Sequence, residues 1–160
     1  SSIEHGIKDA MEAGPMLSYP ITDIKVEFID GSFHEIDSSD IAFRIAASMA
    51  LKEAMKKGNP QLLEPIMKLQ VITPEEYLGD ILGSLSKRRC KVEKLDRQGV
   101  SQVIEAMAPM GEMFGYTTEL RSLSQGRATH SMEFSHMEIA PPQVRDAVIA
   151  AVRGIPWAGQ

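Results

Sequence analysis

The chain has 160 residues, a hydrophobic fraction of 43% and a formal net charge of −5. This composition supports a packed core in one domain or two small ones and excludes wholesale disorder, while the mild acidity argues against general nucleic-acid binding through bulk electrostatics. The single cysteine, Cys90, excludes an intramolecular disulfide and argues against a structural zinc site, and no apolar run approaches the roughly 20 residues of a membrane helix. Any RNA contact therefore has to be local. No signal-like segment stands at Ser1, and we expect the chain to be a piece of something longer.

The N-terminal part of the chain carries a helical pattern and then a strand pattern. Ile3, Ile7 and Met11 recur at helical spacing, and Gly14 ends that helix. In the segment ITDIKVEFID, residues 21–30, apolar and charged side chains alternate, which predicts a half-buried strand.

A turn and a long helix follow this expected strand. Asp30-Gly31 is a turn signal, so His34 is expected in or beside an exposed loop. Residues 37–39 offer several caps for a helix over residues 39–57, which Gly58 ends. The apolar residues of this helix are spread broadly around it, which predicts close packing against a sheet.

The stretch Leu62–Arg89 is the pivot between two modules. Its first half reads as a strand, and its second half reads as a helix that starts at a Thr-x-x-Glu capping box formed by Thr73 and Glu76, with Pro74 at the first helical position. The expected helix gathers its apolar residues on one face and ends in a basic cluster. The face consists of Tyr77, Leu78, Ile81, Leu82 and Leu85, and the cluster of Lys87, Arg88 and Arg89.

The rest of the chain completes the second module. We expect strands at residues 90–95 and 100–108 around a turn at 96–99, a helix opened by Pro109 and ended by Gly126, and a strand at residues 128–134. With the pivot, this order predicts a ferredoxin-like split β-α-β (βαββαβ) domain with a four-stranded antiparallel sheet and both helices on one face. A short helix should follow Pro141, and residues 154–160 should be frayed. The fold class is α+β, with a partial β-α-β module at residues 1–61, the ferredoxin-like domain at 62–139 and a helix with a tail at 140–160.

Residue patterns alone do not favour catalysis. No Gly-x-x-x-x-Gly-Lys-Ser/Thr or Gly-x-Gly-x-x-Gly motif occurs, so nucleotide phosphate binding has no support in this chain. His34 with residues 37–39 offers the residue types of a hydrolytic triad, but these hydroxyls stand where a helix needs caps. His130 and His136 would lie roughly 20 Å apart on one strand, too far to share a metal ion. Arg88 and Arg89 either contact phosphate or complement a helix end.

Three long segments carry a resemblance to a known family. They are DGSFHEIDSSDIAFRIAASMALKEA, LLEPIMKLQVITPEEYLGDILGSLSKRR and EMFGYTTELRSLSQGRATHSMEF, and from Ile3 to Ile139 their order and spacing resemble the C-terminal end of elongation factor G. The resemblance implies that residues 1–61 are the later part of the fourth domain of that factor and that the fifth domain starts at Leu62. The parent would be a GTPase that binds GTP and magnesium in a domain missing here, and this fragment would be no enzyme and hold no cofactor or metal.

The resemblance also implies partners and site residues. The partners would be the ribosome (rRNA and ribosomal proteins), tRNA and mRNA in the cytoplasm or in a mitochondrial matrix, with no membrane. The parent is expected to be a monomer, although the incomplete fragment could pair with a second copy. The tip loop at the decoding site would comprise Gly31, Ser32, Phe33, His34, Asp37 and Ser38. The ribosome-facing residues of the fifth domain would be Arg88, Arg89, Glu112, Phe114, Tyr116, Arg121, Gln125 and Arg127, with Phe114 expected in the core and Gly115 and Gly126 answering backbone needs.

Some positions depart from the family pattern. Cys90 stands where the family usually has Gly, Gly111 where it has Ala or Ser, and residues 97–99 shorten a more Gly-rich turn. These departures keep open a paralogue specialised in ribosome recycling and a ribosome-protection protein of tetracycline resistance. A stand-alone ferredoxin-like interaction or small-molecule-sensing domain is the alternative from another class.

Overall fold

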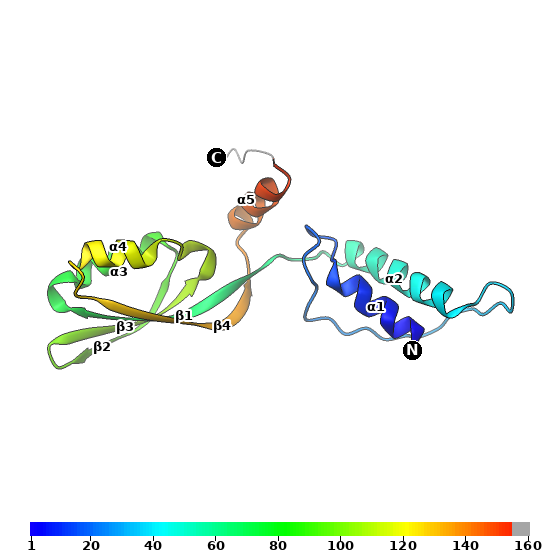
Figure 1. Cartoon of the computed structure of the whole chain (residues 1–160), viewed down its shortest axis with the longest axis horizontal. Coiled ribbons are helices and arrows are strands. Elements are labelled where there is room, and N and C mark those ends of the chain that lie inside the picture. Colours follow the sequence, from blue (N-terminus) through cyan, green and yellow to red (C-terminus); the bar gives the residue numbers. More distant parts are fainter. Residues whose placement is uncertain (155–160) are drawn as a thin grey trace. The chain divides into compact units, whose positions relative to one another are not determined.

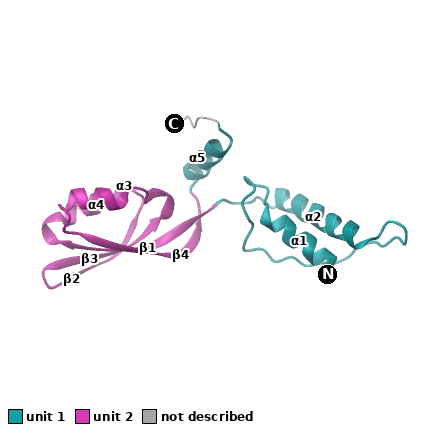
Figure 2. Cartoon of the chain, viewed as in Figure 1, with its two compact units in different colours: residues 1–62, 141–160 teal, residues 63–140 magenta. Residues whose placement is uncertain are grey.

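A computed structural model describes residues 1–154 of the chain. The chain forms two compact units (Figures 1 and 2). Unit 1 comprises residues 1–62 and the residues from Pro141 onward, and unit 2 comprises Leu63–Ala140.

Unit 1 is built around two helices, α1 (Ser2–Glu12) and α2 (Asp40–Lys57). The hydroxyl of Ser39 caps α2 by accepting a hydrogen bond from the backbone N–H of Ala42 at 3.1 Å, as expected of a serine at this position. The two helices bury a small core of Ala10, Leu51 and Met55. They approach closely at Gly6, where an added Cβ would lie 2.1 Å from the carbonyl oxygen of Arg44, so no side chain fits there.

The strand expected at residues 21–30 does not form. The segment has no regular secondary structure and pairs with no strand among the described residues. Its apolar side chains are exposed, apart from Ile21, which packs against the small core of the two helices. The prediction was wrong because an alternating pattern specifies the two faces of a strand, whereas a strand also needs a neighbouring backbone for its hydrogen bonds. The other elements of unit 1 are helices, which offer no such neighbour.

The outer side of α2 also lacks a packing partner within the described residues. Ile41, Ile45 and Met49 recur every fourth residue and are all exposed. The sheet expected to pack against this helix is therefore not present in residues 1–154.

Unit 2 has the predicted ferredoxin-like fold. Its sheet has four antiparallel strands in the order β2-β3-β1-β4, and α3 and α4 cover one face of it (Figure 1). The strands are β1 (Leu63–Pro74), β2 (Lys91–Gln98), β3 (Ser101–Pro109) and β4 (Thr129–Ile139), and the helices are α3 (Leu78–Lys87) and α4 (Tyr116–Leu123). The tight turn between β2 and β3 is Gly99-Val100, somewhat later than expected.

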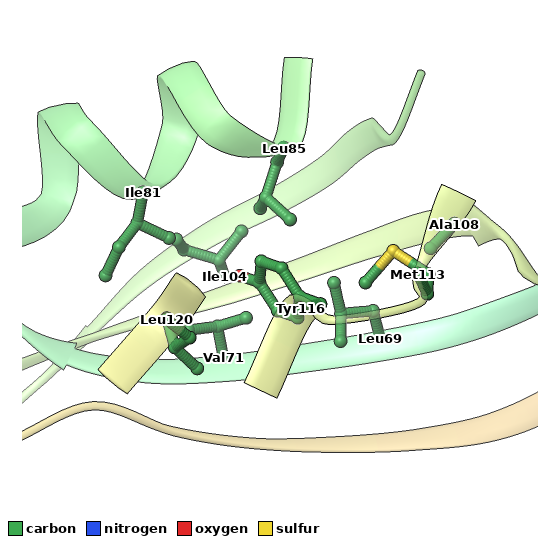
Figure 3. Packing of buried hydrophobic residues seen from close by; sticks show 9 residues of the cluster. All are labelled: Leu69, Val71, Ile81, Leu85, Ile104, Ala108, Met113, Tyr116 and Leu120. Atoms are coloured by element: carbon green, nitrogen blue, oxygen red, sulfur yellow. The ribbon is translucent and has the colours of Figure 1, made fainter. Parts of the chain in front are cut away.

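The core of unit 2 lies between the helices and the covered face of the sheet (Figure 3). Period-two side chains of β1 and β3 meet the apolar stripes of α3 and α4 there, so the two periodicities point to the same core. The core consists of Leu69, Val71, Ile81, Leu85, Ile104, Ala108, Met113, Tyr116 and Leu120.

The predicted capping box at the start of α3 is absent. Thr73 belongs to β1, where it pairs with Gln102 of β3, and its hydroxyl donates to the carbonyl oxygen of Pro74 at 3.0 Å. A 3₁₀ turn over Glu75–Tyr77 leads into α3 without a side-chain cap. Local sequence suggested a cap, but the strand pairing extends through Thr73 and keeps it in the sheet.

The end of the described chain is a helix, α5 (Pro142–Val152), which confirms the expected C-terminal helix. The frayed tail was expected at residues 154–160, of which residues 155–160 lie outside the described part.

Candidate functional site

The backbone of the loop Asp30–Ser39, here called the His34 loop, is fixed by local hydrogen bonds. The hydroxyl of Ser38 accepts from the N–H of His34 at 2.7 Å, and the carbonyl oxygen of His34 accepts from the N–H groups of Asp37 and Ser38 at 3.2 and 2.9 Å. The N–H of Gly31 donates to the carboxylate of Asp30 at 2.7 Å. Because Ser39 caps α2 immediately afterwards, this loop is attached directly to a helix.

The side chains of the His34 loop point to its use as a contact surface. His34 is exposed, and Ile36 is 96% exposed. The ring of Phe33 stacks on that of Phe43 in α2, with centroids 6.3 Å apart and planes at 10°. This stacking supports the loop from the helix side and leaves the imidazole free for a partner.

The hydroxyls near His34 bind backbone groups rather than the imidazole. Ser38 accepts from the N–H of His34, and Ser39 accepts from the N–H of Ala42. A serine nucleophile needs a base at its hydroxyl. The arrangement is therefore that of a turn and a helix cap.

The second candidate region is an arginine pair at the end of α3. Arg88, with its side chain only 18% exposed, donates from Nε to Glu119 of α4 at 2.9 Å, and its Nη2 also contacts that carboxylate. Its Nη1 donates to the carbonyl oxygens of Glu112 and of Phe114, the latter at 3.1 Å. The guanidinium also lies 5.3 Å from the ring centroid of Tyr116. Arg88 therefore joins α3, α4 and the loop before α4.

Arg89 performs a similar task on the other side of that loop. It binds both carboxylate oxygens of Glu64 in β1, at 2.7 and 2.8 Å, and its Nε lies 3.3 Å from Glu112. Its backbone is left-handed, with φ of +57°, which directs the two neighbouring arginines to different partners. Both guanidiniums are held by carboxylates of the same unit, and Arg88 is the C-cap residue of α3. The two alternatives expected for this pair, phosphate contact or helix-end complement, stay predictions.

The carboxylate of Glu119 is stabilised by these contacts. Hydrogen bonds from Arg88, and then from the Ser84 hydroxyl at 2.7 Å, hold its pKa below the usual value. Glu119 is thus charged in the folded unit at neutral pH.

The other residues that were expected to face the ribosome differ in their exposure to solvent. Arg121, Gln125 and Arg127 are exposed. Tyr116 is only 2% exposed and belongs to the core, whereas Phe114, which was expected in the core, is 77% exposed. These two expectations were wrong because Gly115 adopts a left-handed conformation with φ of +75°, which reverses the chain between the two aromatic residues.

The turn after α4 carries the remaining predicted residues. Gln125 and Gly126 have φ of +51° and +77°, and the N–H of Gly126 donates to the carbonyl oxygen of Arg121 at 2.8 Å. Gly126 therefore stands where the backbone is left-handed, a conformation that favours glycine, as predicted. Arg127 pairs with Glu76, and its guanidinium lies 5.7 Å from the ring centroid of Tyr77.

The histidines of β4 take separate places. The ring of His130 meets that of Tyr116 edge-on at 5.5 Å, and His136 pairs with Glu138 at 2.7 Å. Within residues 1–154, no three His, Cys, Asp or Glu side chains are arranged to hold a metal ion. None of the helices in the same part of the chain is long and apolar enough to cross a membrane.

Sequence reasoning missed the acidic partners of the arginines. Glu64 and Glu119 stand 25 and 31 positions from the arginines that they bind. Only the spatial meeting of β1, α3 and α4 creates these pairs, so no local pattern could have indicated them.

Two family models together match nearly the whole chain. "Elongation factor G, domain IV" matches residues 1–59, and "Elongation factor G C-terminus" matches residues 61–148. The chain belongs to the elongation factor G family. The two models meet close to the limit between unit 1 and unit 2 at Leu62.

Relatives from the elongation factor G family are close in sequence. The chain is 55% identical to elongation factor G of Thermotoga maritima over 151 residues, which cover 94% of this chain and 22% of the relative. It is 53% identical to elongation factor G of Fervidobacterium nodosum over 148 residues, covering 92% of this chain and 21% of that relative. The chain thus spans about a fifth of the length of these relatives.

A solved structure supports the same fold. The crystal structure of a protein from Thermus thermophilus superposes with a TM-score of 0.88 at 37% identity, covering 97% of this chain and 24% of that one.

Proposed function

We propose that this chain is the C-terminal, ribosome-contacting portion of an elongation factor G that promotes GTP-dependent translocation of tRNA and mRNA on the ribosome. Units 1 and 2 correspond in this proposal to the later part of the fourth domain (1–61) and to the fifth domain (62–139), followed by a C-terminal segment (140–160). Family membership over nearly the whole chain supports the assignment. The factor would act in the cytoplasm, with the ribosomes.

The rigid His34 loop is the observation that carries this proposal. Its turn is closed by three hydrogen bonds to the backbone of His34, so a partner can bind the exposed imidazole with little ordering cost. An imidazole can hydrogen-bond to phosphate, to a 2′-hydroxyl or to a base edge, or stack on a base. We place this loop at the decoding site, in contact with tRNA and mRNA.

The proposed role of this chain is mechanical. It holds no motif for nucleotide phosphates, so we place GTP and magnesium in a part of the parent outside these 160 residues. The His34 loop would prevent tRNA and mRNA from slipping back, and unit 2 would dock on the large ribosomal subunit.

Single-round translocation by the full-length parent tests this proposal. Replacing His34→Ala removes one strong polar contact, and we expect a loss of translocation rate of about tenfold or more. His5→Ala is the matched control, because it removes an exposed imidazole from α1 in the same unit. A native parent that does not translocate but splits ribosomes with a recycling factor would replace the proposal by the recycling role. An unchanged rate for His34→Ala would refute the assignment of the loop.

A further inference from the structure

Residues 24–28, here called the unpaired segment, have the sequence of a strand but no strand beside them. The apolar side chains of Ile24, Val26 and Phe28 are 40, 42 and 62% exposed, and they alternate with the exposed side chains of Lys25 and Glu27. Within residues 1–154, no backbone hydrogen bond involves these five residues. Their N–H and C=O groups are therefore open to pairing with the backbone of another strand.

The two open edges of the sheet in unit 2 are less suited to such pairing. The register of β2 on β3 shifts between Val92 and Lys94, and the register of β4 on β1 shifts between Ile66 and Met67. Such bulges interrupt an edge, and natural sheets use them against edge-to-edge association. The unpaired segment contains neither proline nor glycine, so its own sequence does not oppose pairing.

The unpaired segment is complementary to itself in one antiparallel register. With a two-fold axis at Val26, Lys25 of each copy faces Glu27 of the other copy. On the other face, Ile24 meets Phe28 across the two strands, which pairs a β-branched with an aromatic side chain.

Other registers of the same two strands are unfavourable. An axis at Lys25 or at Glu27 places two like charges directly opposite each other, which is destabilising. An axis between two residues places apolar side chains opposite charged ones, because a shift by one position exchanges the faces of a strand. The axis at Val26 is therefore the register that satisfies both faces of the pair.

The outer side of α2 offers a surface on which a two-stranded ribbon can pack. Two strands alone are marginally stable in water, so the ribbon needs a helix against its apolar face. Ile41, Ile45 and Met49 are 71, 54 and 65% exposed. Their row is about 12 Å long on a helix, and the unpaired segment is about 13 Å long as a strand. The ribbon thus has the length needed to cover this row.

We propose that two copies of this chain associate through residues 24–28. The two segments form an antiparallel ribbon about a two-fold axis at Val26, and its apolar face packs on the row of Ile41, Ile45 and Met49 in both copies. Both helices then lie on the same side of the ribbon, because residues opposite each other in a strand pair share one face. This inference concerns the 160-residue chain itself and does not rest on the proposed function.

The mass of the 160-residue chain in solution tests whether this dimer forms. Sedimentation equilibrium over a range of concentrations should show a reversible shift from 17.6 kDa, the mass of one chain, towards twice that mass. A single-chain mass at every concentration would overturn the proposal. Growth beyond the dimer would also overturn it, because a two-fold contact closes on itself.

Disulfide trapping tests the register, in a Cys90→Ser background that removes the single cysteine of the chain. Val26→Cys should form a disulfide between copies, because facing residues of an antiparallel pair have Cα atoms about 4.5–5.5 Å apart. Ile24→Cys and Phe28→Cys should each fail alone, since the same residue of the other copy lies about 13 Å further along the ribbon, but should crosslink when mixed. Failure of Val26→Cys, or equal crosslinking of all three variants alone, would overturn the proposal.

Charge reversal tests the pairs between Lys25 and Glu27. Lys25→Glu should weaken association roughly two- to 30-fold, because it turns two attractive pairs of the dimer into repulsive ones. Adding Glu27→Lys makes the charges opposite again and should restore most of the affinity. Lys91→Glu is the matched control, since it makes the same change of charge at an exposed position of β2. An effect of Lys91→Glu as large as that of Lys25→Glu would overturn the proposal.

A polar substitution on α2 tests the packing of the ribbon. Ile45 is exposed in the single chain, so Ile45→Ser leaves the core of unit 1 in place. It should weaken association by about tenfold or more, because each copy loses an apolar side chain that the ribbon would cover. Undiminished association of Ile45→Ser would overturn the packing of the ribbon on α2.

Discussion

Two glycines of the loop Met110–Gly115, which precedes α4, offer a sharp test of why this loop has its shape. Gly111 and Gly115 both have open space where a Cβ would stand, with no atom within 4 Å. They differ in backbone conformation, because Gly115 has φ of +75° whereas Gly111 lies in the 3₁₀ turn Met110–Glu112 without a positive φ. An alanine at each position therefore isolates backbone strain from crowding.

The expected effects of these two substitutions have opposite signs. Gly115→Ala should cost about 1–2 kcal/mol of the stability of unit 2, because an L side chain is strained in the left-handed region. Gly111→Ala should stabilise unit 2 by about 0.4–1 kcal/mol, because alanine restricts the unfolded chain and fits this conformation.

Native-state hydrogen exchange of β1 and β3 in the whole chain measures both effects. These central strands report the opening of unit 2 independently of unit 1. Their exchange should become roughly five- to 30-fold faster in Gly115→Ala and about two- to fivefold slower in Gly111→Ala. Equal effects of both substitutions would refute the assignment of the cost at Gly115 to backbone strain.

Two further predictions concern the contact between α1 and α2 and the ion pair between Arg88 and Glu119. Gly6→Ala should cost about 1–3 kcal/mol of the stability of unit 1, because the added methyl group forces α1 away from α2. Amide exchange should become faster in both helices and stay unchanged in β1 and β3. Unchanged exchange in α2 would contradict this prediction. Because the folded-state pKa of Glu119 is depressed, its contribution to stability is present above the unfolded pKa of about 4.3 and is lost as the pH falls through the folded pKa. Between about pH 6 and about pH 3, the urea midpoint of unit 2 should therefore fall less in Glu119→Gln than in the native chain. Equal pH dependence of the two midpoints would contradict this prediction.

Much of unit 2 could be predicted from sequence because local patterns and global packing agree there. Period-two strands and apolar helix faces gave the order of elements, and Leu69 and Ile81 lie in the core that their patterns indicate. Thr73 shows the limit of local reasoning, because its pattern matches a cap while pairing with Gln102 keeps it in β1. Residues 21–30 fail for the same reason, since alternation cannot supply a pairing partner.

The candidate sites divide in the same way. The His34 loop was predictable because a turn signal and a helix cap are adjacent in sequence. The exposure of Phe114 and the burial of Tyr116 were not predictable, because they depend on the left-handed conformation of Gly115 between them. The pairing of Arg88 with Glu119 was also not predictable, since the two residues meet only after α3 and α4 pack on the sheet.

The partly buried thiol of Cys90 is a built-in chemical probe of the folding of unit 2. Burial raises the pKa of this thiol to about 11, so at neutral pH only about one molecule in ten thousand carries the reactive thiolate in the folded unit. In an unfolded chain, with a pKa of about 8.5, the thiolate fraction is roughly three in a hundred. As Cys90 is the single cysteine, a thiol reagent should label the folded chain roughly 300-fold more slowly than the unfolded chain, without any engineered probe.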